Sequence, residues 1–130
     1  MQDSIFTKII RGEIPCYKIY EDADTLAFLD IEPNVIGHTL VVPKKQVDQF
    51  NDLDDASYHA VFSTVKKVAN HLQSKLGTDR IGLSIKGVDV PHAHVHVLPF
   101  NIGEHMGPHE SSPRLSPEEL QVLQEKLKFL

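Results

Sequence analysis

The stretch Pro91-His92-Ala93-His94-Val95-His96-Val97-Leu98-Pro99 places three histidines at alternate positions within a short apolar run. Side chains of a β-strand alternate between its two faces, so the histidines are predicted to project together from one face. The intervening Ala and Val side chains are then directed into a core. Each imidazole has ring nitrogens that need partners, and each can change its charge near neutral pH. The row therefore indicates a functional site on a sheet.

Two chemistries fit such a row, and a solvated strand face without a function is the third explanation. Imidazole is the commonest protein ligand for zinc and several transition metals, which favours a metal centre. Alternatively, one imidazole attacks a phosphorus atom while its neighbours hold or protonate the phosphate oxygens. A zinc ion needs its ligands about 2 Å away, whereas His92 and His96 start ~13 Å apart on a strand. Neighbouring pairs can share an ion, but the spacing disfavours a centre built from all three.

The segments on either side of the row predict an α+β fold, with an antiparallel sheet of about five strands and one long helix packed beside it. The predicted strands are residues 18–21, 25–30, 38–42, 80–86 and the histidine row. Apolar residues recur at helical spacing over 54–76, which predicts the long helix. Short helices are predicted at each end of the chain, with Ser4 and Ser116 as their N-caps.

Composition is that of an ordinary globular domain, with 41% hydrophobic and 24% charged residues among 130. We predict one domain over residues 1–130, with a core of about 4–100 and a C-terminal loop and helix over 101–130. The net charge of −5 argues against nucleic-acid binding. Cys16 is the only cysteine, and neither a secretory signal nor an apolar membrane span is evident, so a cytoplasmic protein without membrane contact is expected.

The row and its flanks resemble the histidine triad family of nucleotide hydrolases and transferases, in particular its purine nucleoside phosphoramidase branch. The family signature is His-x-His-x-His followed by two apolar residues, and it matches residues 92–98. Residues 5–15, 27–33 and 37–45 are similar to further family segments and stand in the same order. The resemblance covers most of residues 4–100 and favours phosphate chemistry over a metal centre.

The resemblance implies a reaction with a covalent intermediate. His94 would attack the α-phosphorus of a purine nucleotide substrate and form a nucleotidyl-phosphohistidine, from which water releases the nucleotide. His38, His92 and His96 would bind the phosphate, with His92 supporting the geometry from the end of the row. The implied substrates are nucleoside phosphoramidates, nucleotidyl-adenylates and dinucleoside polyphosphates. No cofactor would be required, a divalent cation would be optional, and the protein would form a homodimer.

The resemblance also assigns the nucleoside contacts and shows two departures. Asp30 would hold the ribose hydroxyls, and Ile31 would contact the base. Many members carry a structural zinc site that begins with Cys-x-x-Cys, but residues 4–7 read Ser-Ile-Phe-Thr, so no structural zinc is expected. Asp89 falls where many members have a hydroxyl that touches the leaving group. Its charge would repel a nearby phosphate, or it would contact a basic leaving group instead.

The departure at Asp89 keeps a second function open, namely a nucleotide-binding module with little catalysis. A metal-binding protein that uses the histidine row is the third candidate. Binding of AMP without turnover would indicate the second function, and metal analysis would reveal the third.

Overall fold

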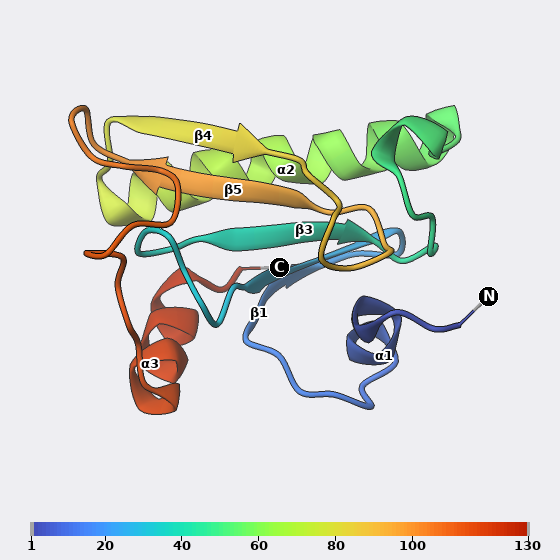
Figure 1. Cartoon of the computed structure of the whole chain (residues 1–130), viewed down its shortest axis with the longest axis horizontal. Coiled ribbons are helices and arrows are strands. Elements are labelled where there is room, and N and C mark those ends of the chain that lie inside the picture. The colour runs from blue at the N-terminus through green and yellow to red at the C-terminus, as the bar shows by residue number, and fades with distance from the viewer. Residues whose placement is uncertain (1, 130) are drawn as a thin grey trace.

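A five-stranded antiparallel sheet in the order β1-β2-β3-β5-β4 forms the centre of the computed structural model, which describes residues 2–129 (Figure 1). The strands are β1 (Lys18–Glu21), β2 (Thr25–Leu29), β3 (Thr39–Pro43), β4 (Arg80–Ser84) and β5 (Val95–Phe100). The helices are α1 (Ile5–Ile10), α2 (Asp55–Leu76) and α3 (Pro117–Leu127), with a short 3-10 helix η1 at Phe50–Asp52. The predicted α+β class is confirmed. The predicted domain includes Met1 and Leu130, which lie outside the described residues.

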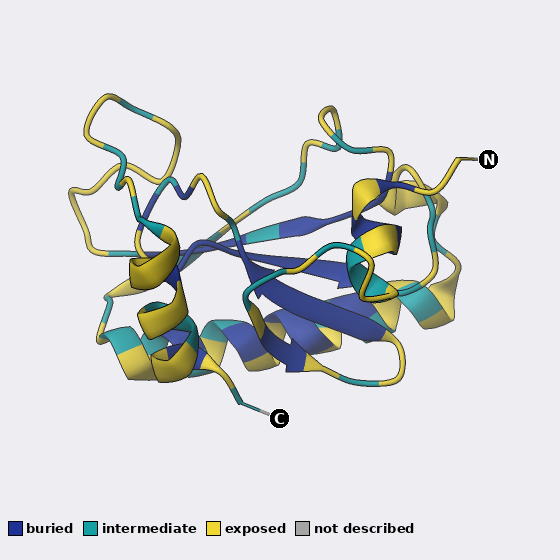
Figure 2. Ribbon diagram, turned by 90° about the horizontal axis from the view of Figure 1, so that it is seen from below, coloured by how far each residue is buried: buried dark blue, intermediate teal, exposed yellow. Residues whose placement is uncertain are grey.

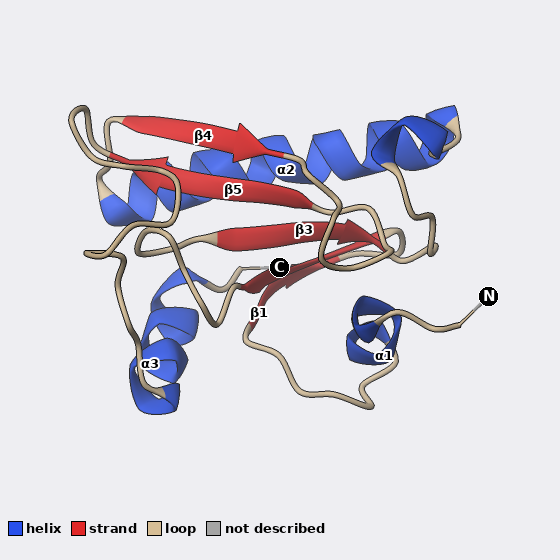
Figure 3. Cartoon of the chain, in the orientation of Figure 1, coloured by secondary structure: helices blue, strands red, loops and turns tan. Residues whose placement is uncertain are grey.

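The two faces of the sheet are covered by different helices (Figure 3). The long helix α2 packs on one face, where Val41, Val95 and Val97 join its buried side chains in the larger core. The short helix α1 covers part of the other face, where Phe6 packs with Phe28, Leu40 and Val42. Figure 2 shows that the central strands are buried on both sides. The alternation therefore directs the apolar residues of the histidine row towards α2, as predicted, and leaves the opposite face for the histidines.

The helices begin and end at the signals that the sequence carries. The Asp54 side chain accepts a hydrogen bond from the Ser57 N–H at the start of α2, and Gly77 ends it with a φ of 68°. Ser116 caps α3 in a capping box with Glu119. None of the helices formed by residues 2–129 is long and apolar enough to span a membrane.

The strands around the histidines are shorter than the alternation predicts. β5 begins at Val95, so the prediction that the three histidines share one strand is wrong for His92 and His94. The backbone before Val95 bonds elsewhere, because the Ala93 N–H donates to the Val47 carbonyl and the His92 N–H to the Val90 carbonyl. His38 likewise immediately precedes β3. The histidines therefore stand where strands begin.

Two other strand ends also differ from the predicted ranges. β2 ends at Leu29, so Asp30 belongs to the following turn, where its carboxylate accepts the Glu32 N–H. β4 ends at Ser84, two residues before the predicted end. The shorter strands leave Asp30 and Lys86 outside the sheet.

Candidate active site

A cavity of about 710 Å³ opens beside the histidines on the sheet face opposite α2. It brings together side chains from the turn after β2, the starts of β3 and β5, and the loop after β4. Of the residues singled out from the sequence, the cavity is lined by Asp30, Ile31, His38, Asp89, His94 and His96. His92 does not line it. The sheet thus collects residues that are up to 66 positions apart around one space.

His94 is held in one tautomer by the backbone. Its Nδ1 lies 2.8 Å from the carbonyl oxygen of His92, and the side chain is buried. A carbonyl oxygen only accepts hydrogen bonds, so Nδ1 carries a proton, and in the neutral ring the lone pair is on Nε2. Phe6 packs edge-on against the imidazole, with the ring centroids 5.1 Å apart. The ring is therefore fixed in orientation, and the form that it adopts is nucleophilic at Nε2.

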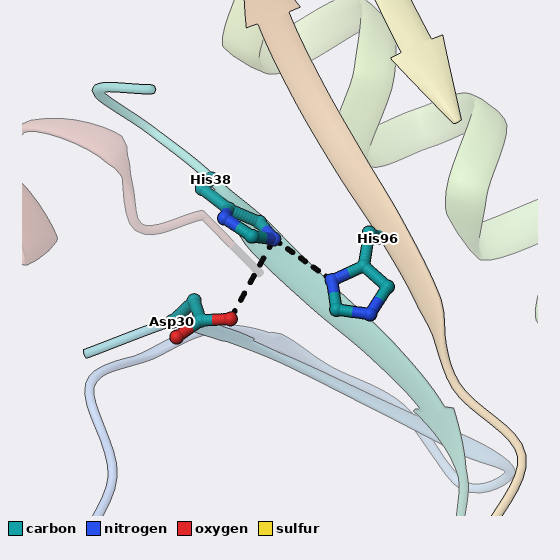
Figure 4. A group of neighbouring side chains, drawn as sticks. All are labelled: Asp30, His38 and His96. Carbon is teal, nitrogen blue, oxygen red and sulfur yellow. Dashed lines mark hydrogen bonds and ion pairs between the residues drawn. The ribbon is translucent and has the colours of Figure 1, made fainter. Parts of the chain in front are cut away.

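His38 and His96 form a directed chain of hydrogen bonds (Figure 4). The backbone N–H of Asn34 donates to Nδ1 of His38 at 3.0 Å, so His38 carries its proton on Nε2. That nitrogen lies 2.8 Å from Nδ1 of His96, which must accept. The proton of His96 is consequently on Nε2. His96 can therefore donate a hydrogen bond to a ligand in the cavity that its side chain lines.

Burial keeps this pair neutral. It lowers the pKa of His38 from 6.5 to about 4, and the pKa of His96 falls to about 4 through burial and the proximity of His38. Burial also raises the pKa of Asp30, against the effect of the hydrogen bond that it accepts from the Glu32 N–H. Asp30 is the only carboxylate of the described residues within 4 Å of His38, at 3.6 Å from its Nε2.

Asp30, His38 and His96 offer ligand atoms that lie within 4.8 Å of one another, which raises the question of a metal ion. Nε2 of His38 faces the other two residues but carries the proton, because its Nδ1 accepts from Asn34. A metal ion would have to displace that proton or break the Asn34 hydrogen bond. The hydrogen bonds therefore suit a proton-donating chain better than a metal centre.

His92 is fully buried, and both of its ring nitrogens are engaged. Nε2 donates to the Pro43 carbonyl at 2.8 Å, and Nδ1 accepts from the hydroxyl of Ser4 at 2.8 Å. The ring therefore has no nitrogen left for the predicted contact with a phosphate. The arrangement does suit the other predicted role of His92, which is to support the geometry of the histidine row. With both nitrogens engaged, His92 also cannot join the other two triad histidines around one ion.

The Ser4-Ile5-Phe6-Thr7 segment, which lacks the Cys-x-x-Cys pair, is attached to His92 by hydrogen bonds. Besides bonding His92, Ser4 Oγ accepts the Thr7 N–H and caps α1. Thr7 Oγ1 donates to Gln46 Oε1 at 2.6 Å. Hydroxyl and amide groups thus join α1 to the segment after β3 and to the start of the histidine row.

Sequence reasoning missed several residues of the cavity. Asn34 orients His38, and Met106, Gly107 and Pro108 of the C-terminal loop form part of the wall. A signal for Met106 was available at Gly82 in β4, where an added Cβ would collide with the Met106 sulfur. The loop is rich in Gly and Pro, however, and its sequence does not reveal which strand it crosses.

The chain is similar in sequence to known proteins. A family model described as the HIT domain matches residues 11–101. An adenosine 5′-monophosphoramidase of Schizosaccharomyces pombe is 36% identical over 129 residues, which is 95% of this chain and 94% of that protein. An adenylylsulfatase of Arabidopsis thaliana is 34% identical over 102 residues, covering 75% of this chain and 52% of that protein.

The fold is also similar to that of a solved Hit-like protein. A crystal structure of a Hit-like protein involved in cell-cycle regulation from Bartonella henselae, with an unknown ligand, superposes with a TM-score of 0.87. It is 32% identical, and the match covers 98% of each chain. Because the HIT model spans well over half of the sequence and the yeast relative matches nearly all of it, the chain belongs to the HIT, or histidine triad, family.

Proposed function

We propose that this HIT-family hydrolase cleaves a bond to the α-phosphate of a purine nucleoside phosphoramidate, nucleotidyl-adenylate or dinucleoside polyphosphate. The observation that carries the proposal is the hydrogen bond from His94 Nδ1 to the His92 carbonyl, which leaves Nε2 with a lone pair. The similarity to an adenosine 5′-monophosphoramidase over nearly the whole chain supports a phosphoramidate as the substrate.

The reaction proceeds in two displacements. Nε2 of His94 forms a bond to the α-phosphorus while the bond to the leaving group breaks, and an amine leaving group takes up a proton as it departs. Water then displaces the histidine and releases the nucleotide, which is AMP for an adenosine substrate. His96 donates its Nε2–H to a phosphate oxygen and stabilises the developing charge, while His38 polarises His96 through their 2.8 Å hydrogen bond.

The nucleoside occupies the end of the cavity formed by the turn after β2. The Asp30 carboxylate lies in the wall of the cavity. In this proposal it accepts hydrogen bonds from the ribose hydroxyls. Ile31, whose side chain is 64% exposed at the same cavity, provides an apolar contact for the base. This route requires no cofactor, although a divalent cation on the substrate is compatible with it. We further propose a homodimer in the cytoplasm, without nucleic-acid or membrane partners.

The test is release of AMP from adenosine 5′-phosphoramidate. Removal of the nucleophile in His94→Asn is expected to reduce kcat by on the order of 10³-fold or more. His59→Asn is the matched control, because His59 is exposed on α2, away from the cavity, and should retain activity. Undiminished turnover by folded His94→Asn would contradict the proposal. AMP binding by the wild-type protein without any turnover would contradict it too and would favour the binding module.

A further inference from the structure

The Met106 side chain packs into a notch in the sheet, at the wall of the cavity proposed for the nucleotide. Gly82 of β4 pairs with Leu98 of β5. Because Gly82 has no side chain, it leaves a notch, and the Met106 sulfur lies so close that an added Cβ would collide with it. Leu98 and His96 alternate onto the same face of β5, and both line the cavity together with Met106. The thioether therefore lies where the C-terminal loop meets the nucleotide cavity.

Packing rather than hydrogen bonding holds this part of the loop. The Asn101 N–H donates to Glu104 Oε1 at 2.6 Å, and the next hydrogen bond of the loop begins at the His109 N–H. Between them, residues 105–108 form no backbone–backbone hydrogen bond within the described part of the chain. The position of this segment therefore depends on side-chain contacts, among which the Met106 sulfur is the one that reaches β4.

Open space borders the segment at two cavities. Met106, Gly107 and Pro108 line the nucleotide cavity of about 710 Å³. The neighbouring His105 and His109 line a second cavity of about 580 Å³. Gly107 adds backbone freedom, because a glycine adopts conformations that other residues avoid. A displacement of the segment therefore changes the shape of the nucleotide cavity without repacking either core of the sheet.

Met106 is accessible to an oxidant, and its sulfur reacts without first losing a proton. The side chain is 37% exposed, and Met1 is the only other methionine of the sequence. Cys16, the single thiol, packs partly buried against the smaller core. Burial raises the pKa of Cys16, which keeps it in the less reactive thiol form. A peroxide therefore finds its accessible sulfur target at the wall of the nucleotide cavity.

We infer that Met106 is an oxidation site, at which a peroxide converts the thioether to a sulfoxide and so moves the loop off the cavity wall. With hydrogen peroxide, the sulfur gives up two electrons and the O–O bond breaks. One oxygen bonds to sulfur, and the other leaves as water with both hydrogens. The larger, polar sulfoxide no longer fits the notch between Gly82 and Leu98. The consequence for nucleotide binding rests on the proposed function, because the altered wall belongs to that site.

The experiment treats the protein with hydrogen peroxide and follows AMP release from adenosine 5′-phosphoramidate. Peptide mass spectrometry should find one added oxygen atom on Met106. We expect KM to rise about tenfold at constant kcat, because the wall binds the ground state and the transition state alike. Treatment with methionine sulfoxide reductase should restore the original KM. Gly82→Ala, whose added Cβ displaces the sulfur, should raise KM without any peroxide.

Two variants separate Met106 from other sites of oxidation. Met106→Leu keeps an apolar side chain that peroxide does not oxidise, so its KM should be the same before and after treatment. Cys16→Ser lacks the thiol and should respond to peroxide as the wild-type protein does. A readout without activity comes from trypsin, which cleaves after Arg114 in the same loop. This cleavage should be faster once Met106 is oxidised, because a displaced loop is more open to a protease.

An unchanged KM after oxidation of Met106 would overturn the inference, and so would an equal response of Met106→Leu. A Met106 that stays unoxidised while the KM rises would overturn it too. Failure of the untreated wild-type protein to release AMP would overturn the proposed function instead. In that case faster cleavage after Arg114 would still support the displacement of the loop, and an unchanged cleavage rate would overturn it.

Discussion

His94 owes its reactive form to a single backbone carbonyl, and that carbonyl is itself well anchored. The His92 residue that supplies it has its ring bonded to Ser4 on one side and to Pro43 on the other. The tautomer of His94 is thus fixed by its nearest neighbours rather than by a carboxylate. A neutral, oriented imidazole is a better nucleophile than a charged one, because protonation would occupy the lone pair on Nε2.

The buried histidine pair should make stability depend on pH. The pKa of His38 and of His96 is about 4 in the folded chain, against 6.5 for an ordinary histidine. Between these values the unfolded chain binds more protons, so the free energy of unfolding rises with pH across this window. We expect it to fall by roughly 2–3 kcal/mol from pH 7.5 to pH 5.5, as measured by urea unfolding. The fall should be smaller in His96→Asn, and equal stability at the two pH values would contradict the neutral pair.

At the scale of elements, α1 does more than cover the sheet. Its N-cap Ser4 bonds both the helix and the buried His92 ring, so the first helix and the histidine row are coupled through one hydroxyl. The contacts of Phe6 with His92 and His94 add to this coupling, with ring centroids 5.8 Å and 5.1 Å apart.

Ser4→Ala should therefore destabilise the fold more than loss of an ordinary cap. Loss of the cap costs about 1 kcal/mol, and a buried His92 nitrogen without a partner adds about 1–3 kcal/mol. We expect a total of roughly 2–4 kcal/mol in urea unfolding. Ser4→Thr retains the hydroxyl and should lose much less. Equal losses for the Ala and Thr variants would show that the hydroxyl does not couple the two elements.

Local patterns were sufficient to predict most elements. The apolar spacing of α2, its Asp54 cap and the Gly77 end are all properties of adjacent residues, and the structure confirms them. The alternation also assigned Val95 and Val97 to the core. The ends of the histidine strands could not be predicted, because they depend on the bond from Ala93 to Val47, a contact between distant segments.

The same limit applies to the site. The histidine motif and the resemblance identified Asp30, His38, His94 and His96, which the sheet brings to one cavity. The role of Asn34 depends on how the loop before β3 folds back on His38, and the place of Met106 depends on a loop that crosses β4. Neither arrangement follows from a repeating pattern in the sequence.

At the scale of the whole molecule, the two edges of the sheet differ. At β1, the Phe129 N–H donates to the Ile19 carbonyl and Gln124 bonds the Lys18 carbonyl, so the C-terminal segment covers this edge. β4 forms the other edge, and among residues 2–129 it pairs with β5 alone. Its Leu83 is 48% exposed. An uncovered edge strand with an exposed apolar residue is a surface on which another strand can pair.

We therefore expect β4 to contribute to the proposed homodimer. Sedimentation equilibrium should give twice the chain mass for the wild-type protein. Leu83→Lys should shift the mass towards the monomer, because a charge would be buried between the two chains. Val122→Lys, also at an exposed apolar position, should remain dimeric. A wild-type protein that sediments as a monomer at micromolar concentration would contradict the homodimer, and dimeric Leu83→Lys would place its interface elsewhere.

The covalent intermediate on His94 is the central claim, and the stereochemistry at phosphorus tests it most directly. The substrate is an adenosine phosphoramidate made chiral at the α-phosphorus with sulfur, and it is hydrolysed in isotopically labelled water. Attack by His94 and then by water inverts the phosphorus twice, so the account predicts a product with retained configuration. Inversion would mean that water attacks the substrate directly, and it would contradict the role assigned to His94.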